Sequence, residues 1–445
     1  MIPELLSPAG SLRNMRYAFA YGADAVYAGQ PRYSLRVRNN EFKDLDTLRT
    51  GMEEAHSQGK KFYLASNISP HNDKIRSYLR DLEPVIEMGP DALIMADPGL
   101  MMLVREKWPE QVIHLSVQAN AVNWAAVKFW HQNGIQRVIL SRELALDEIE
   151  EIRQRVPEME IEVFVHGALC IAYSGRCLLS GYMNHRDPNQ GACTNACRWK
   201  YQAHEAKEDE TGDIVAAHPP EPVQTFIPEP QPAIVTEPVL LQQAQRPGEF
   251  MPAYEDEHGT YIMNSKDLRA VQHVERLAAM GVHSLKIEGR TKSHYYVART
   301  AQVYRRAIDD AAHGKPFDMH LMDELDTLAN RGYTEGFYRR HPPKEYQNYE
   351  MGLNNAQQQQ FVGEVVDAKD SVITVDVKNR FVTGDTLELM LPGGNTRFQL
   401  KTLSDKHGKA IDAAPGSGHR VQIPLDQPLA ESALKYGLLV KDINA

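Results

Sequence analysis

The sequence predicts an α/β protein: a TIM-like parallel β/α barrel followed by a small C-terminal all-β barrel domain. At 445 residues the chain is too long for one ordinary core, which indicates a large domain and a smaller one. A glycine followed by a short apolar run recurs along the first part of the chain, with helical periodicity between the runs. Near residue 361 this pattern changes to alternation of apolar and polar residues, which is typical of an all-β domain.

Each glycine with its apolar run is interpreted as the end of a helix that leads into a buried strand. Glycine adopts the left-handed conformation that ends helices, and a parallel strand covered on both faces is apolar throughout. About eight such strands are expected, the number in a closed β/α barrel. An open doubly wound sheet is the alternative, but no G-x-G-x-x-G turn follows an early strand. The five runs that begin with a glycine are Gly22–Tyr27, Gly59–Leu64, Gly89–Ile94, Gly134–Ile139 and Gly281–Lys286, and the further strands are Leu5–Leu6, Val112–Val117 and Ile161–Val165.

Helices are expected between these strands. Apolar residues three or four positions apart share one helix face, and such a face predicts a helix that covers a sheet. Three faces of this kind are formed by Leu45, Leu48, Met52 and Ala55, by Leu268, Val271, Val274 and Leu277, and by Tyr296, Thr300, Val303 and Ala307.

The segment 204–259 differs from the barrel in composition. It holds 12 acidic and two basic residues, so it accounts for the whole formal charge of −10, and nine prolines lie from Pro219 to Pro252. This composition predicts an exposed, mobile insertion. The remaining residues are neutral in sum, so the acidic total does not exclude an RNA partner. We divide the chain into barrel segments 1–203 and 260–345, the insertion 204–259, a linker 346–360 and a small β-barrel domain 361–445.

Composition and the N-terminus predict a cytoplasmic protein without a membrane partner. Apolar residues make up 42% and charged residues 24%, and no apolar run reaches the roughly 18 to 20 residues of a membrane span. The first residues lack the basic region and cleavage site of a secretory signal. In a reducing compartment, clustered cysteines more often bind metal or act in catalysis than form disulfides.

The four cysteines Cys170, Cys177, Cys193 and Cys197 fall within 28 residues, spaced C-x6-C-x15-C-x3-C. Structural zinc usually takes its ligands from two tight C-x2-4-C pairs, and only the second pair here approaches that form. Four unevenly spaced thiolates suit a 4Fe-4S cluster, which we favour over zinc and over unrelated buried thiols. Because Cys170 closely follows the strand 161–165, we expect the cluster beside the mouth of the barrel.

Residues just after the barrel strands are the candidates for catalysis. Lys286, Glu288 and Arg290 alternate along one strand and share a face, where a row of charges is costly unless it serves a site. Arg290 or Lys286 is expected to bind an anionic group, and an ion-pair row with Glu288 is the alternative. His166 is the fourth candidate catalytic residue, although a histidine at a strand end is as often structural. The full strand-end set is Asp97, Gln118, Arg142, Glu143, His166, Lys286, Glu288 and Arg290.

Two runs combine basic and aromatic residues, which together hold phosphates and stack on bases. One is Arg198-Trp199-Lys200-Tyr201, next to the last cysteine, and the other is Arg331-Gly332-Tyr333 with Phe337-Tyr338-Arg339-Arg340-His341. We consider both candidates for RNA binding. A packed strand and a solvated linker explain the runs equally well.

Several segments resemble the signature of peptidase family U32. The most specific is Glu162–Cys170, EVFVHGALC, which continues through Ser174–Ser180, SGRCLLS. The opening Glu4–Gly10, ELLSPAG, and the late Leu285–Arg290, LKIEGR, match as well, so the resemblance spans nearly the whole predicted barrel. The chain length, the acidic insertion and the terminal β-domain are most similar to those of members that hydroxylate tRNA.

The resemblance implies oxygen-independent hydroxylation of the wobble uridine to 5-hydroxyuridine, with a 4Fe-4S cluster on the four cysteines and prephenate as co-substrate. The implied partners are the tRNA anticodon loop, the iron–sulfur assembly machinery and an electron donor. Hydroxylation of ribosomal RNA or the ubiquinone ring, and a non-catalytic role as a cluster-binding or RNA-binding partner, remain alternatives. A protease has no local support, because H-E-x-x-H and G-x-S-x-G are absent and a His166–Cys170 pair would use a cluster ligand as nucleophile.

Overall fold

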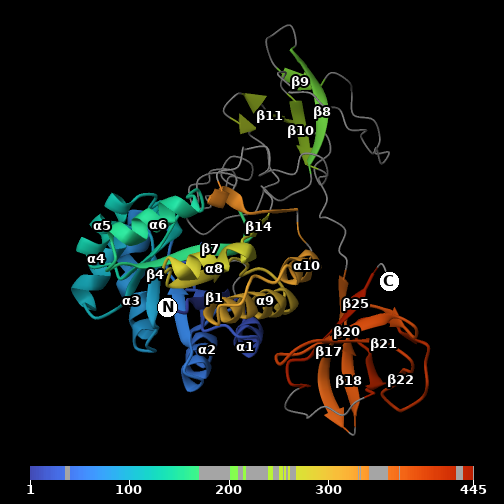
Figure 1. Cartoon of the computed structure of the whole chain (residues 1–445). Helices are drawn as coiled ribbons and strands as arrows, with labels where there is room; N and C mark the ends of the chain where they lie inside the picture. The colour runs from blue at the N-terminus through green and yellow to red at the C-terminus, as the bar shows by residue number, and fades with distance from the viewer. Residues whose placement is uncertain are drawn as a thin grey trace.

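The computed structural model describes the barrel, part of the insertion and the C-terminal domain (Figure 1). In the insertion only the backbone of short strands is described. The described residues are 1–35, 41–169, 201–208, 214–216, 239–243, 250–253, 255–256, 259–260, 267–328, 330, 332–339, 359–369, 371–426 and 434–443.

Eight parallel strands form a closed barrel in the described part of the chain. Their order is β15-β1-β2-β3-β4-β5-β6-β7, and β7 pairs back onto β15. The predicted barrel is therefore confirmed over the open sheet, and the five glycines expected to end helices all have positive φ. The strands are β1 (Glu4–Pro8), β2 (Ala25–Gly29), β3 (Lys61–Ala65), β4 (Ala92–Met95), β5 (Ile113–Leu115), β6 (Arg137–Ile139), β7 (Glu160–Ala168) and β15 (Ser284–Ile287).

Helices surround this barrel (Figure 1). Several begin at a Ser, Asp or Asn whose side chain accepts a hydrogen bond from the first turn, as Ser11 and Ser293 do. The apolar faces predicted on α2 and α9 are buried against the sheet, except for the half-exposed Leu45. The helices are α1 (Leu12–Ala20), α2 (Leu45–Ser57), α3 (Asn72–Ile86), α4 (Pro98–Lys107), α5 (Trp124–Gln132), α6 (Leu146–Arg155), α8 (Val274–Ala279), α9 (His294–Ala312) and α10 (His320–Asp326).

The helix predicted from Leu268 begins later than the periodicity indicated. Asp267–Arg269 forms strand β14, which pairs antiparallel with the end of β7, and a short 3-10 turn, Val271–His273, precedes α8. β16 (Tyr333–Thr334) pairs with β14 on its other side. The segment Asp267–Arg269 forms a strand because the end of β7 offers it backbone hydrogen bonds, and this pairing overrides a weak helical pattern.

The insertion contains strands that its composition did not predict. β8 (Tyr201–Glu208), β9 (Ile214–Ala216), β10 (Val239–Gln243) and β11 (Phe250–Ala253) form a four-stranded sheet, which Figure 1 draws apart from the barrel. β12 (Glu255–Asp256) and β13 (Gly259–Thr260) pair with each other. The prediction followed the high proline content of the whole segment. It did not take account of Val239-Leu240-Leu241, a short apolar run without proline that favours a strand.

The C-terminal domain is all-β, as predicted. Its main sheet is antiparallel and has the order β21-β20-β25-β17-β18-β24-β22, so it forms a half-barrel with β21 and β22 at its edges. Its strands are β17 (Gln359–Lys369), β18 (Val372–Val377), β19 (Phe381–Val382), β20 (Thr386–Met390), β21 (Thr396–Gln399), β22 (Ser404–Asp405), β23 (Ala413–Ala414), β24 (Arg420–Pro424) and β25 (Leu438–Asp442).

The C-terminal domain packs against α1 and α9 of the barrel. Met390, Leu438 and Val440 belong to the same apolar core as the barrel residues. The hydroxyl of Tyr21 donates to the carbonyl of Met390 at 3.0 Å, and the buried Arg299 donates to Glu388 at 2.8 Å. The two domains therefore share a core that is bordered by polar contacts.

Among the helices in the described residues, none has the length and apolar character that crossing a membrane requires.

The turn from β1 into α1 packs closely against the segment that follows β15. A Cβ at Gly10 would lie 2.0 Å from the carbonyl oxygen of Arg290. We expect Gly10→Ala to lower the midpoint of thermal unfolding, because the backbone must move at a cost of about 1–3 kcal/mol. Gly393→Ala is the matched control, since a Cβ there meets nothing within 4 Å. Equal midpoints in differential scanning calorimetry would contradict this packing.

Candidate active site

A cavity lies at the carboxyl ends of the barrel strands, the end at which β/α barrels carry their active sites. Five residues of the predicted strand-end set meet there: Gln118, Arg142, Lys286, Glu288 and Arg290. The lining is completed by Tyr27, Leu35, Ala65, Asn67, Ile94, Ser116, Val117, Ile139, Phe164 and Ala168.

Three residues of the predicted set, Asp97, Glu143 and His166, do not line this cavity. Asp97 caps α4, where its carboxylate accepts a hydrogen bond from the backbone N–H of Leu100 at 2.9 Å. Glu143 accepts a hydrogen bond from the hydroxyl of Ser141 at 2.5 Å. Both carboxylates thus hold local structure beside the mouth of the barrel.

Of the charged row predicted along one strand, only Lys286 lies on β15, because the strand ends at Ile287 and Glu288 and Arg290 follow it. All three side chains are held by other elements. The Lys286 ammonium donates to Glu162 of β7 at 2.7 Å, and both side chains are buried. Arg142 donates to Glu288 at 3.2 Å, and Arg290 donates to the hydroxyl of Ser34 at 2.8 Å. These contacts fix three cationic side chains and one carboxylate around the cavity.

A second group of charged side chains lies inside the barrel, on the side of Lys286 away from the cavity. Arg137 donates to Glu4 at 2.6 Å and to Glu162 at 3.3 Å, and the Tyr63 hydroxyl donates to Glu4 at 2.8 Å. Burial raises the pKa of Glu4, but its contacts, chiefly with Arg137, outweigh burial and leave that pKa lowered. Burial lowers the pKa of Lys286, and Glu162 offsets only part of this effect.

Aromatic rings separate the cations at the mouth. The Arg142 guanidinium lies 3.7 Å from the centre of the Phe164 ring, and the Lys286 ammonium lies 4.3 Å from that of Tyr27. The Arg290 guanidinium is 5.7 Å from the same Tyr27 ring. Cation–π attraction stabilises each charge without neutralising it, and the cavity lining holds three cations and one carboxylate, Glu288.

His166 lies on the other side of the sheet from the cavity. The register of β7 with β15 shifts after Phe164, so that His166 pairs with Ile287 rather than continuing the inward alternation. Its ring packs among Tyr296, Tyr304 and Tyr333 at centroid distances of 5.8, 5.6 and 5.4 Å. Burial lowers the pKa of His166 to about 3, so the ring is neutral near pH 7.

The predicted cluster ligands Cys170, Cys177, Cys193 and Cys197 lie outside the described residues, as do Arg198, Trp199, Lys200 and Arg340. Asp267, the first described residue after Thr260, pairs with Ala168 on the cavity wall. Arg339 is 60% exposed and lies 3.3 Å from Glu335. Within the described ranges, no group of three or more His, Cys, Asp or Glu residues could hold a metal ion.

Three residues of the site were not predicted from the sequence. Glu162 and Ser34 accept hydrogen bonds from the cavity residues Lys286 and Arg290, and Asn67 lines the cavity. Glu162 had a signal, because Glu160 and Glu162 alternate within an otherwise apolar strand, where a buried carboxylate needs a partner. Ser34 and Asn67 had none, because only the folded loops bring them to the mouth.

Comparisons with known proteins agree with this architecture. The model of peptidase family U32 matches residues 10–348, and that of the U32 C-terminal domain matches residues 357–434. The tRNA hydroxylation proteins P of Escherichia coli and Haemophilus influenzae are 65% and 62% identical, over 99% of this chain and 97% and 96% of their own lengths. The 23S rRNA 5-hydroxycytidine C2501 synthase of E. coli is 29% identical over 90% of this chain and 54% of its own.

The buried pair Lys286–Glu162 gives a stability prediction. We expect Lys286→Met to destabilise the fold by about 3–5 kcal/mol, because it leaves a buried carboxylate without its nearest cation. Lys61→Met is the matched control: that ammonium lies 3.4 Å from Glu4 on a side chain that is 53% exposed, so its loss should cost less than about 1 kcal/mol. Urea unfolding of the two variants measures the difference, and similar losses would refute the assigned role of the pair.

Proposed function

The chain belongs to peptidase family U32, and we propose that within this family it is an enzyme that hydroxylates tRNA. The observation that carries the proposal is 65% identity to the E. coli tRNA hydroxylation protein P over 99% of the chain. The cavity at the barrel mouth, lined by three cations and one carboxylate, supports it, because that is where a β/α barrel positions a substrate.

The reaction that we propose is oxygen-independent hydroxylation of the wobble uridine to 5-hydroxyuridine, with prephenate as co-substrate. Simple acid–base chemistry does not hydroxylate a ring carbon of uridine, so a redox centre is required. A 4Fe-4S cluster would supply one-electron chemistry, and the donor set fits it, since the chain has four cysteines within 28 residues. Leu169, which precedes Cys170, directly follows Ala168 on the cavity wall, which supports a cluster near the mouth.

The cavity residues suit an anionic co-substrate with a ring. Arg290 and Arg142 offer guanidinium N–H groups that can bind carboxylates in pairs, and Lys286 adds a third cation. Glu288 orients Arg142 through their contact at 3.2 Å. The rings of Tyr27 and Phe164 form apolar walls between the cations. His166 would act indirectly, by holding the end of β7 from the helix side.

An RNA substrate would enter as an unstacked base. An anticodon loop already presents such bases, so flipping a uridine into the cavity costs less than in a duplex. A ribosomal RNA substrate is the second candidate, because the E. coli rRNA enzyme is also related. The chain spans nearly the whole of the tRNA hydroxylation proteins but about half of the rRNA enzyme, which favours tRNA.

A cysteine substitution tests the redox proposal. We expect Cys193→Ala to abolish 5-hydroxyuridine in tRNA when the variant is expressed in a strain that lacks the natural gene, because one iron of the proposed cluster loses its thiolate ligand. Mass spectrometry of tRNA nucleosides, with iron and sulfide analysis of the anaerobically purified protein, measures both properties. Ser57→Ala, an exposed position on α2, is the control. Undiminished hydroxylation by the cysteine variant, or zinc in place of iron in the unmodified chain, would refute the cluster.

An arginine substitution tests the cavity separately from the cluster. We expect Arg290→Gln to raise the KM for prephenate roughly tenfold or more, because a charge-assisted hydrogen bond to a carboxylate is lost. Iron and sulfide content should not change. Arg32→Gln, whose side chain is 65% exposed, is the control. An unchanged KM in reconstituted hydroxylation assays would remove Arg290 from the binding site.

A further inference from the structure

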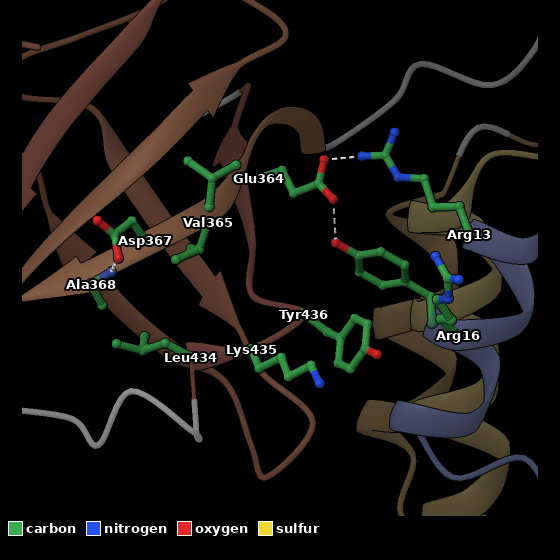
Figure 2. A pocket seen from close by; sticks show the side chains of 11 residues that line it. Arg13, Arg16, Glu364, Val365, Asp367, Ala368, Leu434, Lys435 and Tyr436 are labelled. Atoms are coloured by element: carbon green, nitrogen blue, oxygen red, sulfur yellow. Dashed lines mark hydrogen bonds and ion pairs between the residues drawn. The ribbon is translucent and has the colours of Figure 1, made fainter. Parts of the chain in front are cut away.

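A cleft separates helix α1 of the barrel from the C-terminal domain (Figure 2). Its volume is about 580 Å³. Arg13 and Arg16 line the barrel side, and Lys435 and Tyr436 line the facing wall. Sites for ligands lie preferentially at such junctions between domains.

The cations of this cleft keep donors available although two of them are paired. Arg13 contacts Glu364, which also accepts a hydrogen bond from the Tyr17 hydroxyl at 2.6 Å. Arg16 binds Glu54 of α2 through Nε and Nη2, at 2.8 and 2.5 Å. A guanidinium has five N–H donors, so these contacts orient both side chains without exhausting them. The ammonium of Lys435 lies 5.3 Å from the Tyr436 ring.

Tyr436 has a backbone conformation that is costly for its residue type. Its φ is +67°, in the left-handed region that bulky side chains rarely adopt. The ring contacts Tyr17 edge-on at 5.3 Å, and its carbonyl accepts a hydrogen bond from Tyr21 at 3.0 Å. A glycine would satisfy the same backbone, so the strain indicates that the aromatic side chain itself is used here.

We propose that this cleft binds the ribose–phosphate backbone of the RNA substrate. The proposal rests on the proposed function and adds a contact surface outside the cavity. The lining holds three cations against two carboxylates, Glu364 and Asp367, and this excess of positive charge suits phosphates. The Tyr436 ring with the apolar Val365 suits a base or ribose. Since α1 starts shortly after β1 ends at Pro8, Arg13 lies on the mouth side of the barrel. A strand that leaves the cavity can therefore continue along α1.

Binding of tRNA to the full-length protein tests the cleft. Charge is removed by the double variant Arg16→Gln/Lys435→Gln, and Lys401→Gln/Lys409→Gln on the exposed surface of the C-terminal domain is the matched control. Unmodified tRNA from a strain without the gene is titrated by fluorescence anisotropy over a series of salt concentrations. We expect roughly tenfold weaker binding at low salt, and a slope of log K against log salt that falls by about one to two.

A second variant, Tyr436→Gly, separates binding from stability. It removes the ring contact with Tyr17 but also relieves the left-handed strain, and because these effects oppose each other the midpoint of thermal unfolding should fall little, while tRNA binding should weaken roughly fivefold or more. Unchanged affinity in both the double variant and Tyr436→Gly would overturn the proposal for the cleft alone. If the unmodified chain neither binds tRNA nor restores hydroxylation, the proposed function fails and the cleft proposal fails with it.

Discussion

The barrel depends on the seam at which β15 pairs with β7 and closes the sheet. Lys286 and Glu162 form their buried ion pair across this seam, and Arg137 links Glu162 to Glu4 on the first strand. Burying these charges is tolerable only because each has a partner of opposite sign. The chain continues from the end of β15 at Ile287 to Glu288 and Arg290, so the contact that closes the barrel lies next to the side chains that line its mouth.

Local sequence was sufficient to predict the barrel. A parallel strand buried on both faces is recognisable from its own apolar run, and a helix-ending glycine such as Gly281 needs no distant partner to be identified. The row Lys286, Glu288 and Arg290 was found in the same way, because alternation fixes which side chains share a face. The cluster on the four cysteines stays a prediction, since their positions lie outside the described residues.

The remaining features depend on residues that are far apart in the sequence. Strand β14 exists because β7 extends beyond the barrel and offers a free edge, which no local pattern at Leu268 reveals. His166 faces α9 because of a register shift, although simple alternation directs it into the cavity. The ion pairs Lys286–Glu162 and Arg299–Glu388 join positions more than 80 residues apart, and a single sequence carries no signal for such pairings.

The contact between Arg299 and the C-terminal domain limits how the two domains can be recombined. The Arg299 side chain is 1% exposed, and Glu388 of β20 is its nearest acceptor. In a barrel without that domain, this guanidinium and the Tyr21 hydroxyl would lose their partners in the C-terminal domain. A different β-domain fused to the barrel would therefore need a carboxylate at the position of Glu388. As a consequence, we expect the barrel and its C-terminal domain to be inherited together.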